Sequence, residues 1–323
     1  MEVTLRPLSL GEILDRMFQL YRSHFLMFAG IASFAAGLDL VWKLIQTSGV
    51  RMAQHYFAPV TLGLVSSGFS LVSLMMYILV SAVAMAATSR AVSALYLGQE
   101  TGVGQAYREV QPHWFRYVRL YFTASFLAWG PALVIFAGFL ALAVAIPAVF
   151  RGAGGAGAAL AIVVVVGLSL FLVVPFGVWM MLRYSLSSPA CVFEDLKVRA
   201  SLKRSIELSK GRKWSILVMA FLAWVISTVL TYAGLMPLII NVFHTVLTHG
   251  TPVVGYGLTI YSLLVGFVVT SITLPLYSIG LTLYYFDQRI RMEGFDVEWL
   301  LQKASPETPP PLGGQPVEPA SHA

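Results

Sequence analysis

Long apolar segments alternate along the chain with short segments in which polar and apolar positions follow a helical period. Residues 52–89, 120–150, 152–182 and 214–286 contain no Asp, Glu, Lys or Arg. A helix needs only about 20 apolar residues to cross the hydrocarbon core of a bilayer. The runs do not alternate with period two, which argues against a transmembrane β-barrel. The pattern predicts six helical spans, near 24–46, 60–88, 114–147, 157–183, 214–240 and 256–286.

The clearest helical period precedes the first span, at residues 8–25. Ser9 and Glu12 form the S-x-x-E pattern of a capping box, in which each side chain satisfies an amide at the helix start. Apolar residues recur at helical spacing from Leu10 to Phe25, and charged residues occupy the opposite face. This pattern predicts a helix in the membrane interface, with its apolar stripe against lipid or against the other helices.

Similar polar segments at 101–113 and 196–211 also precede pairs of apolar runs. Aromatic residues that suit the headgroup level mark each turning point, at His24-Phe25, His113-Trp114 and Lys213-Trp214. We therefore predict an all-α polytopic membrane protein built from three repeats of a cytoplasmic amphipathic helix plus a transmembrane hairpin. The expected units are about 8–89, 101–184 and 196–287 within a single membrane domain, 1–303. A cytoplasmic helix at 288–303 and a disordered, Pro-rich cytoplasmic tail at 304–323 follow.

Composition and charge support this reading and orient it. Of the 323 residues, 58% are hydrophobic and 11% charged, outside the range of soluble domains. Of the 21 Lys and Arg residues, all but Lys43, Arg51 and Arg151 lie in the termini, in the segments after spans two and four, or at the ends of spans three and four that adjoin these segments. The positive-inside rule makes these segments, and both termini, cytoplasmic. The net charge of +6 then indicates orientation and attraction to anionic phospholipid, and not nucleic acid.

Asp39 and Lys43 are the candidate intramembrane polar pair. They stand four residues apart on one face of the first span, where they can pair with each other. Ionisable residues at membrane depth are functional candidates by default, but Lys43 lies toward the end of the span and can reach the interface. Both a structural pair and a role in transport or headgroup binding are open.

Basic residues of the polar segments are the candidate contacts for lipid headgroups, with an acidic cytoplasmic partner as the second reading. The residues are Arg16, Arg22, Lys197, Arg199, Lys203, Arg204, Lys210, Arg212 and Lys213.

Pro131, Pro175 and Pro275 fall inside spans three, four and six, where each removes a backbone donor and is expected to kink its helix. A broken helix around a substrate site is the functional alternative to a packing kink.

Nothing in the sequence indicates a catalytic, metal or cofactor site. His55, His244 and His249 fall in predicted outer loops without an accompanying carboxylate or thiol, and their spacing does not suit zinc. No H-E-x-x-H, G-x-S-x-G or P-loop motif occurs. The single cysteine, Cys191, excludes an internal disulfide. We expect a protein that is not an enzyme and binds no cofactor.

Three stretches carry a resemblance to a known family: residues 6–16 (RPLSLGEILDR), 200–214 (ASLKRSIELSKGRKW) and 284–296 (YYFDQRIRMEGFD). Together they are similar to the bacterial glycerophosphodiester phosphodiesterase membrane domain. Some relatives carry a soluble catalytic barrel after this domain, and after Trp299 this chain has only a predicted tail. The resemblance implies a bacterial inner-membrane location and a role near phospholipid metabolism without phosphodiesterase activity.

These observations favour a non-enzymatic, multi-pass inner-membrane protein. Its expected role is that of a lipid-associated scaffold or accessory subunit in membrane or phospholipid homeostasis, with a membrane or cytoplasmic protein as a further possible partner. A transporter or channel is the alternative, supported by the expected kinks in spans three, four and six. Its substrate would be a lipid or another apolar molecule, because the shortage of membrane-embedded charges argues against ion or proton coupling.

Overall fold

The computed structural model describes residues 6–149, 155–210, 212–248 and 255–294, and every regular element within these ranges is helical. The predicted tail 304–323, most of the predicted helix 288–303 and most of the glycine-rich turn 151–157 lie outside the described residues. The elements in chain order are α1 (Leu10–Ser23), α2 (Phe25–Ala53), α3 (Pro59–Tyr96), α4 (Val103–Val110), the 3-10 turn η1 (Gln111–His113), α5 (Trp114–Val149), α6 (Gly155–Tyr184), α7 (Ser187–Phe193), α8 (Val198–Leu208), α9 (Lys213–Gly234), α10 (Met236–Leu247) and α11 (Tyr256–Glu293).

Six of these helices, α2, α3, α5, α6, α9 and α11, are long and apolar enough to cross a membrane. The longest, α3 and α11, have 38 residues each, which corresponds to about 57 Å and exceeds a hydrocarbon core of about 30 Å. Helices of this length must either tilt in the membrane or project beyond the hydrocarbon core. The predicted all-α class and the six spans are confirmed. The chain is a multi-pass membrane protein.

The helix starts follow the local sequence signals. At α1 both hydrogen bonds of the predicted capping box are present, because the Glu12 amide donates to the Ser9 hydroxyl at 3.3 Å and the Ser9 amide donates to the Glu12 carboxylate at 2.7 Å. The spans α2, α5 and α9 begin at Phe25, Trp114 and Lys213, at the predicted turning points. Local capping and aromatic anchors therefore locate where each hairpin starts.

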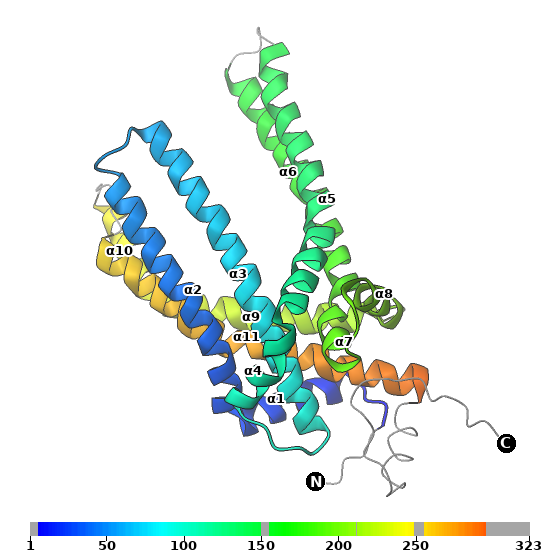
Figure 1. The fold of residues 1–323 in the computed structure, drawn as a ribbon. Helices are drawn as coiled ribbons and strands as arrows, with labels where there is room; N and C mark the ends of the chain where they lie inside the picture. The colour runs from blue at the N-terminus through cyan, green and yellow to red at the C-terminus, as the bar shows by residue number, and fades with distance from the viewer. Residues whose placement is uncertain (1–5, 150–154, 211, 249–254, 295–323) are drawn as a thin grey trace, which may run out of the picture.

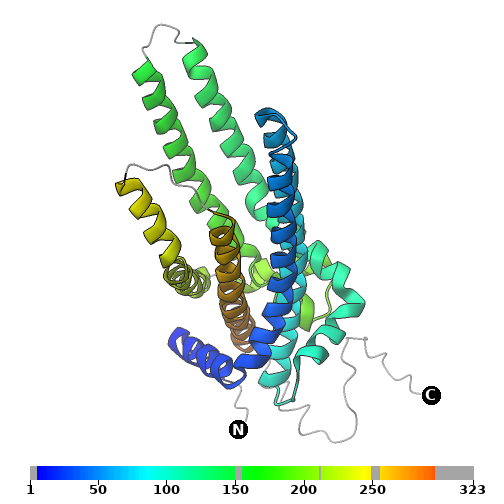
Figure 2. The same cartoon turned by 90° about the vertical axis from the view of Figure 1, so that its left-hand side faces the viewer.

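The long helices converge at one end of the molecule and fan out toward the other (Figure 1). We call the first the core end, which holds α1, α4, α7 and α8, and the opposite tips of the long helices the far ends. In both views α1 lies across the base of the bundle, and the α5–α6 hairpin projects away from α2, α3 and α11 (Figures 1 and 2). Side chains on the far halves are exposed, for example Leu64 at 72% and Phe171 at 74%, as suits helices surrounded by lipid.

The buried core lies at the core end and is centred on the C-terminal half of α11. Tyr284, Tyr285 and Phe286 are at most 1% exposed, and the Phe286 ring stacks on Tyr96 of α3 with centroids 4.8 Å apart. Gly280 lets α11 approach its neighbours, because a Cβ there would lie 3.0 Å from the Met17 sulfur of α1. Packing at this end therefore joins helices from all parts of the chain.

Several elements differ from the sequence prediction. Helices α2 and α3 run to Ala53 and Tyr96, beyond the predicted span ends at 46 and 88. The fifth span ends at Gly234, not at 240, because Leu235 leaves the helix and Pro237 occupies the first turn of the separate helix α10. The predicted span six and the described part of the predicted cytoplasmic helix 288–303 form one continuous helix, since α11 runs without interruption to Glu293 and ends at Gly294 in the left-handed conformation. The short helix α7 was not predicted.

The short helices α4 and α8 each pack against the hairpin that precedes them in the chain, and α1, which precedes every hairpin, packs against the last one. Helix α4 contacts α2 and α3, α8 contacts α5 and α6, and α1 contacts α11 of the last hairpin. A side-chain hydroxyl donates to a backbone carbonyl in each case: Tyr107 to Ile31 at 2.7 Å, Ser205 to Arg183 at 2.9 Å, and Tyr21 to Ile272 at 2.8 Å. The apolar stripe of α1 thus faces the bundle, with Ile13 and Met17 buried.

Candidate functional sites at the two ends of the bundle

Asp39 and Lys43 form an ion pair on α2, with 2.7 Å between the carboxylate and the ammonium. The Asp39 side chain is 18% exposed and the Lys43 side chain 45%. Asp39 Oδ2 faces Lys43, whereas its Oδ1 is buried without a hydrogen-bond partner among the described residues. The sequence-predicted pairing is therefore present, and one carboxylate oxygen is left over.

A polar groove of about 630 Å³ begins at this pair and opens between the far ends of α2, α3 and α11. Its volume lies within the range of small-ligand sites. None of the residues that line it is acidic. The polar lining residues are Lys43, Gln46, Thr47, Arg51 and Gln54 from α2 and its C-cap, Ser66 and Ser70 from α3, and Tyr256 and Thr259 from α11.

Side chains around the groove are held by hydrogen bonds and a ring contact. Ser73 of α3 accepts a hydrogen bond from the Trp42 indole at 2.8 Å and donates to the Gln46 carbonyl oxygen at 2.6 Å. This orientation leaves the Gln46 amide group free to donate. The Arg51 guanidinium lies over the Tyr256 ring, 4.7 Å from its centroid, and forms no ion pair with a described residue. The groove therefore presents donors and two cations.

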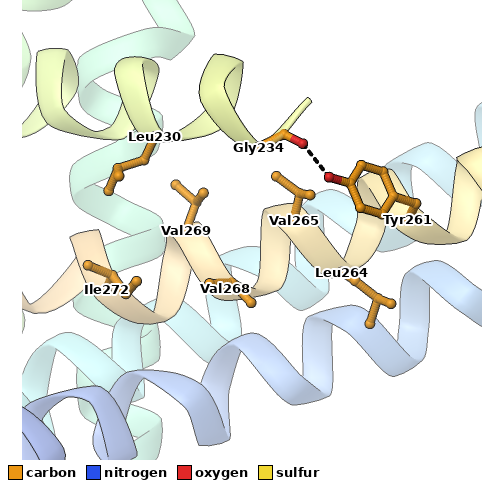
Figure 3. Close-up of a pocket in the computed structure, with 8 residues that line it drawn as sticks. All are labelled: Leu230, Gly234, Tyr261, Leu264, Val265, Val268, Val269 and Ile272. Atoms are coloured by element: carbon orange, nitrogen blue, oxygen red, sulfur yellow. Dashed lines mark hydrogen bonds between the residues drawn. The ribbon is translucent and has the colours of Figure 1, made fainter. Parts of the chain in front are cut away.

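A second groove, of about 340 Å³, lies between α9 and α11 (Figure 3). Leu230 and Gly234 of α9 face the α11 residues Tyr261, Leu264, Val265, Val268, Val269 and Ile272. The Tyr261 hydroxyl, the one polar side-chain group of this lining, donates to the Gly234 carbonyl at 2.6 Å. Because that hydroxyl is already engaged, the groove offers no polar group that would orient a ligand.

At the core end, α11 organises two clusters of ion pairs. In the first, the buried Asp287 carboxylate accepts from the Leu8 amide at 2.8 Å and from Arg291 Nε at 2.9 and 3.0 Å. Arg291 also donates to the Leu8 carbonyl at 2.6 Å. These contacts tie the segment before α1 to α11.

In the second cluster, Glu194 after α7 meets α8 and α11. Its carboxylate accepts from Arg204 Nε at 3.0 and 3.1 Å and from the Tyr285 hydroxyl at 2.6 Å. Arg204 also pairs with Glu293. Arg204 was predicted as a headgroup contact, but the structure gives it these two internal partners, because the unpredicted α7 places Glu194 beside it.

The other predicted headgroup contacts divide into two groups. Arg16 lies 5.5 Å from the Tyr96 ring centroid, Lys213 lies 4.7 Å from that of Trp179, and Arg212 is 3.9 Å from Asp287. The remaining five are exposed and form no ion pair with a described residue: Arg22, Lys197, Arg199, Lys203 and Lys210. Four of these five belong to α8 and its flanks, and we call these four the α8 cations.

The three prolines lie within uninterrupted helices. Pro131 is in α5, Pro175 in α6 and Pro275 in α11, and each helix continues on both sides of its proline. The structure therefore does not support the alternative of a broken helix around a substrate site. Pro275 is buried in the core, whereas Pro131 and Pro175 are exposed on the α5–α6 hairpin. The polar groove adjoins none of the three.

Comparison with known proteins identifies no relative. No protein-family model, no curated protein and no solved structure matches the chain. The resemblance to the glycerophosphodiester phosphodiesterase membrane domain therefore rests on the three stretches quoted above. The function must be argued from the two ends of the bundle themselves.

Sequence reasoning missed most of the polar groove. Its signals were present, because Lys43 and Arg51 are two of the three basic residues that lie away from the predicted cytoplasmic side. Ser66, Ser70 and Ser73 also share one face of span two at helical spacing. The sequence did not indicate that Tyr256 and Thr259 of α11 line the same groove, because long-range packing brings them there.

Proposed function

We propose that this chain is a non-enzymatic, lipid-associated membrane protein whose core end rests on an anionic bilayer surface. The observation that carries the proposal is the set of α8 cations, Lys197, Arg199, Lys203 and Lys210. All four are exposed and form no ion pair with a described acid. The nearby acids Glu194 and Glu293 bind Arg204, Asp195 binds Arg116, and Glu207, the one acid of α8, forms no ion pair with a described residue. Cations left without internal partners are available to external anions.

The magnitude favours lipid as that anion. Each basic residue near an anionic membrane surface contributes about 1 kcal/mol, so four of them supply about 4 kcal/mol before screening. Helix α8 is seen end-on in Figure 1, so it runs across the direction in which α5 and α6 rise. A helix in this position presents its cations along the membrane surface. A scaffold or accessory role in phospholipid homeostasis follows from this contact and from the family resemblance.

The location that we propose is the bacterial inner membrane, with the core end and both termini in the cytoplasm. The basic residues concentrated at that end support this orientation. A Lys203→Cys variant tests it, because position 203 is exposed and the native Cys191 is buried. An impermeant thiol reagent should label the variant in inside-out vesicles and not in intact cells. Labelling from outside would overturn the orientation.

Lipid contact is tested by neutralising the α8 cations with glutamine and reconstituting the protein in mixed bilayers of phosphatidylglycerol and phosphatidylcholine. After gentle extraction, native mass spectrometry should show less phosphatidylglycerol retained by the quadruple variant than by wild type. A matched variant with Lys197, Lys203 and Lys210 changed to arginine keeps the charge and should retain wild-type lipid. Equal retention by all three proteins would refute the lipid contact.

The alternative function, transport of a lipid or other apolar substrate, finds less support. The helices with internal prolines are unbroken, and the polar groove lies at the far ends of α2, α3 and α11. An acidic cytoplasmic protein partner would use the same α8 cations. Co-purification of such a protein, lost in the glutamine variant and kept in the arginine variant, would favour it over lipid.

A further inference from the structure

We infer that the polar groove between the far ends of α2, α3 and α11 is a binding site for a phosphate-bearing anion. The groove is lined by two cations, Lys43 and Arg51, and by amide and hydroxyl donors, and no acid belongs to its lining. This site lies at the opposite end of the molecule from the α8 cations and does not depend on them.

The electrostatic balance of the groove favours an anion. Lys43 is neutralised in part by Asp39, at 2.7 Å, on the side of the groove nearer the core. Arg51 has no such partner among the described residues, and its contact with the Tyr256 ring engages the face of the guanidinium and leaves its edge donors free. A guanidinium presents paired N–H groups that match two oxygens of a phosphate or carboxylate.

Depth in the membrane distinguishes phosphate among the possible anions. Along α2, Lys43 lies about 27 Å from Phe25, the aromatic residue at the start of the span, and Arg51 about 39 Å from it. With Phe25 at one boundary of a hydrocarbon core of about 30 Å, Lys43 reaches the opposite boundary and Arg51 extends into the headgroup layer. Phosphate groups of the lipids are the anions present at that level.

Both cations are exceptions to the charge distribution of the chain. Arg116, Arg119 and Arg183 lie at the cytoplasmic ends of the predicted spans three and four, and only Lys43, Arg51 and Arg151 lie away from the predicted cytoplasmic side. Two of these three line one groove, next to Gln46, whose amide group is oriented by the Ser73 hydrogen bond. Two basic residues on the side of the membrane where the positive-inside rule disfavours them, in a groove lined by hydrogen-bond donors, indicate that this groove binds an anionic ligand.

The test measures phosphate and lipid binding separately. Purified protein in a maltoside detergent, which contains no phosphorus, is titrated with inorganic phosphate and, in a parallel sample, with short-chain phosphatidylglycerol. Chloride at equal ionic strength is the reference, and the readouts are the thermal unfolding midpoint and native mass spectrometry. Stabilisation by both ligands indicates a general phosphate site, whereas stabilisation by the lipid alone identifies the headgroup as the source.

Substitutions locate the site. Arg51→Gln should weaken the binding of the effective ligand about tenfold, the equivalent of one charge-assisted contact. Arg51→Lys, which keeps the charge and loses the paired donors, should weaken it less. Arg108→Gln removes an equally exposed arginine from α4 at the core end and should bind like wild type.

Two further variants make the outcome decisive. The double change Asp39→Asn with Lys43→Gln removes one groove cation without leaving an unpaired carboxylate, and it should also weaken binding. Because the α8 cations are proposed to hold phosphatidylglycerol as well, Arg51→Gln is also compared in the quadruple α8 glutamine background, where its loss of binding should persist, so failure of the core-end proposal leaves this one standing. If neither ligand shifts the midpoint relative to chloride, or if Arg51→Gln and Arg108→Gln behave alike, the groove is not a phosphate site.

Discussion

The carboxylate of Asp287 should decide whether α1 stays docked on the bundle. Asp287 is 1% exposed and accepts hydrogen bonds from the Leu8 amide, from Arg291 and from the Gln288 amide group at 3.1 Å. Asp287→Ala removes the acceptor of the Leu8 amide and the carboxylate partner of Arg291, which keeps only its hydrogen bond to the Leu8 carbonyl. Breaking a buried pair costs about 3–5 kcal/mol. Since Arg291 is 31% exposed and can be hydrated, we expect the lower end, about 3 kcal/mol.

The loss should be local to the docking of α1. A change of about 3 kcal/mol is about two powers of ten in an equilibrium constant, so hydrogen exchange of the α1 amides should accelerate about 100-fold. Asp287→Asn keeps an oxygen that can accept from Leu8 and should cost about half as much. Unfolding in mixed detergent micelles and hydrogen exchange measured by mass spectrometry report the global and local effects. The matched control is Asp15→Asn, an exposed acid on α1 that forms no ion pair with a described residue.

The reasoning fails if α1 exchanges in Asp287→Ala as slowly as in the Asp15→Asn control. It also fails if the acceleration extends equally to the far halves of α5 and α6, which lie at the opposite end of the molecule from α1 (Figure 1). In that case Asp287 would stabilise the bundle as a whole, and the tie between the N-terminal segment and α11 would be incidental.

Three further predictions concern α1 and the groove. Tyr21→Phe removes a hydrogen bond to a backbone carbonyl of α11 and should lower the free energy of unfolding by about 1 kcal/mol, measured in mixed micelles. The pKa of Glu12 is lowered from 4.5 to about 2, first by the backbone amide of Ser9 and then by Arg6, so its contribution is complete above about pH 4.5 and disappears as the pH falls through about 2. Protection of the first α1 amides, measured relative to the intrinsic exchange rate at each pH, should fall over that window in wild type and not in Glu12→Gln. Lys43→Gln should cost more stability than the double variant with Asp39→Asn, because the single change leaves a largely buried carboxylate unpaired.

The parts of the fold that local physics determines could be predicted from sequence. The six spans follow from apolar length, and the starts of α2, α5 and α9 follow from aromatic and basic residues at the turning points. The α1 capping box is formed by residues three apart. Each of these signals lies within a few residues of the feature that it specifies, and each is satisfied without reference to the rest of the chain.

Features that depend on distant residues escaped the sequence. Beyond the predicted span, Asp287 and Arg291 of α11 form hydrogen bonds with Leu8, which lies about 280 residues earlier. Arg204 lies in a basic segment typical of headgroup contacts, yet it forms ion pairs with Glu194 and Glu293, which belong to other parts of the chain. Pro237 could have signalled the end of α9, but the surrounding residues are apolar enough to suggest a continuing span.

The order in which the short helices dock has a consequence for how the hairpins are held together. Helix α4 binds the hairpin before it and leads directly into the hairpin after it, and α8 does the same one step later. The third hairpin has no short helix after it in the described residues, and α1 takes that place on α11. The first element of the chain thus closes against the last. In this arrangement no hairpin completes its core-end packing alone, so the α8 surface and the far-end groove are positioned by one shared core.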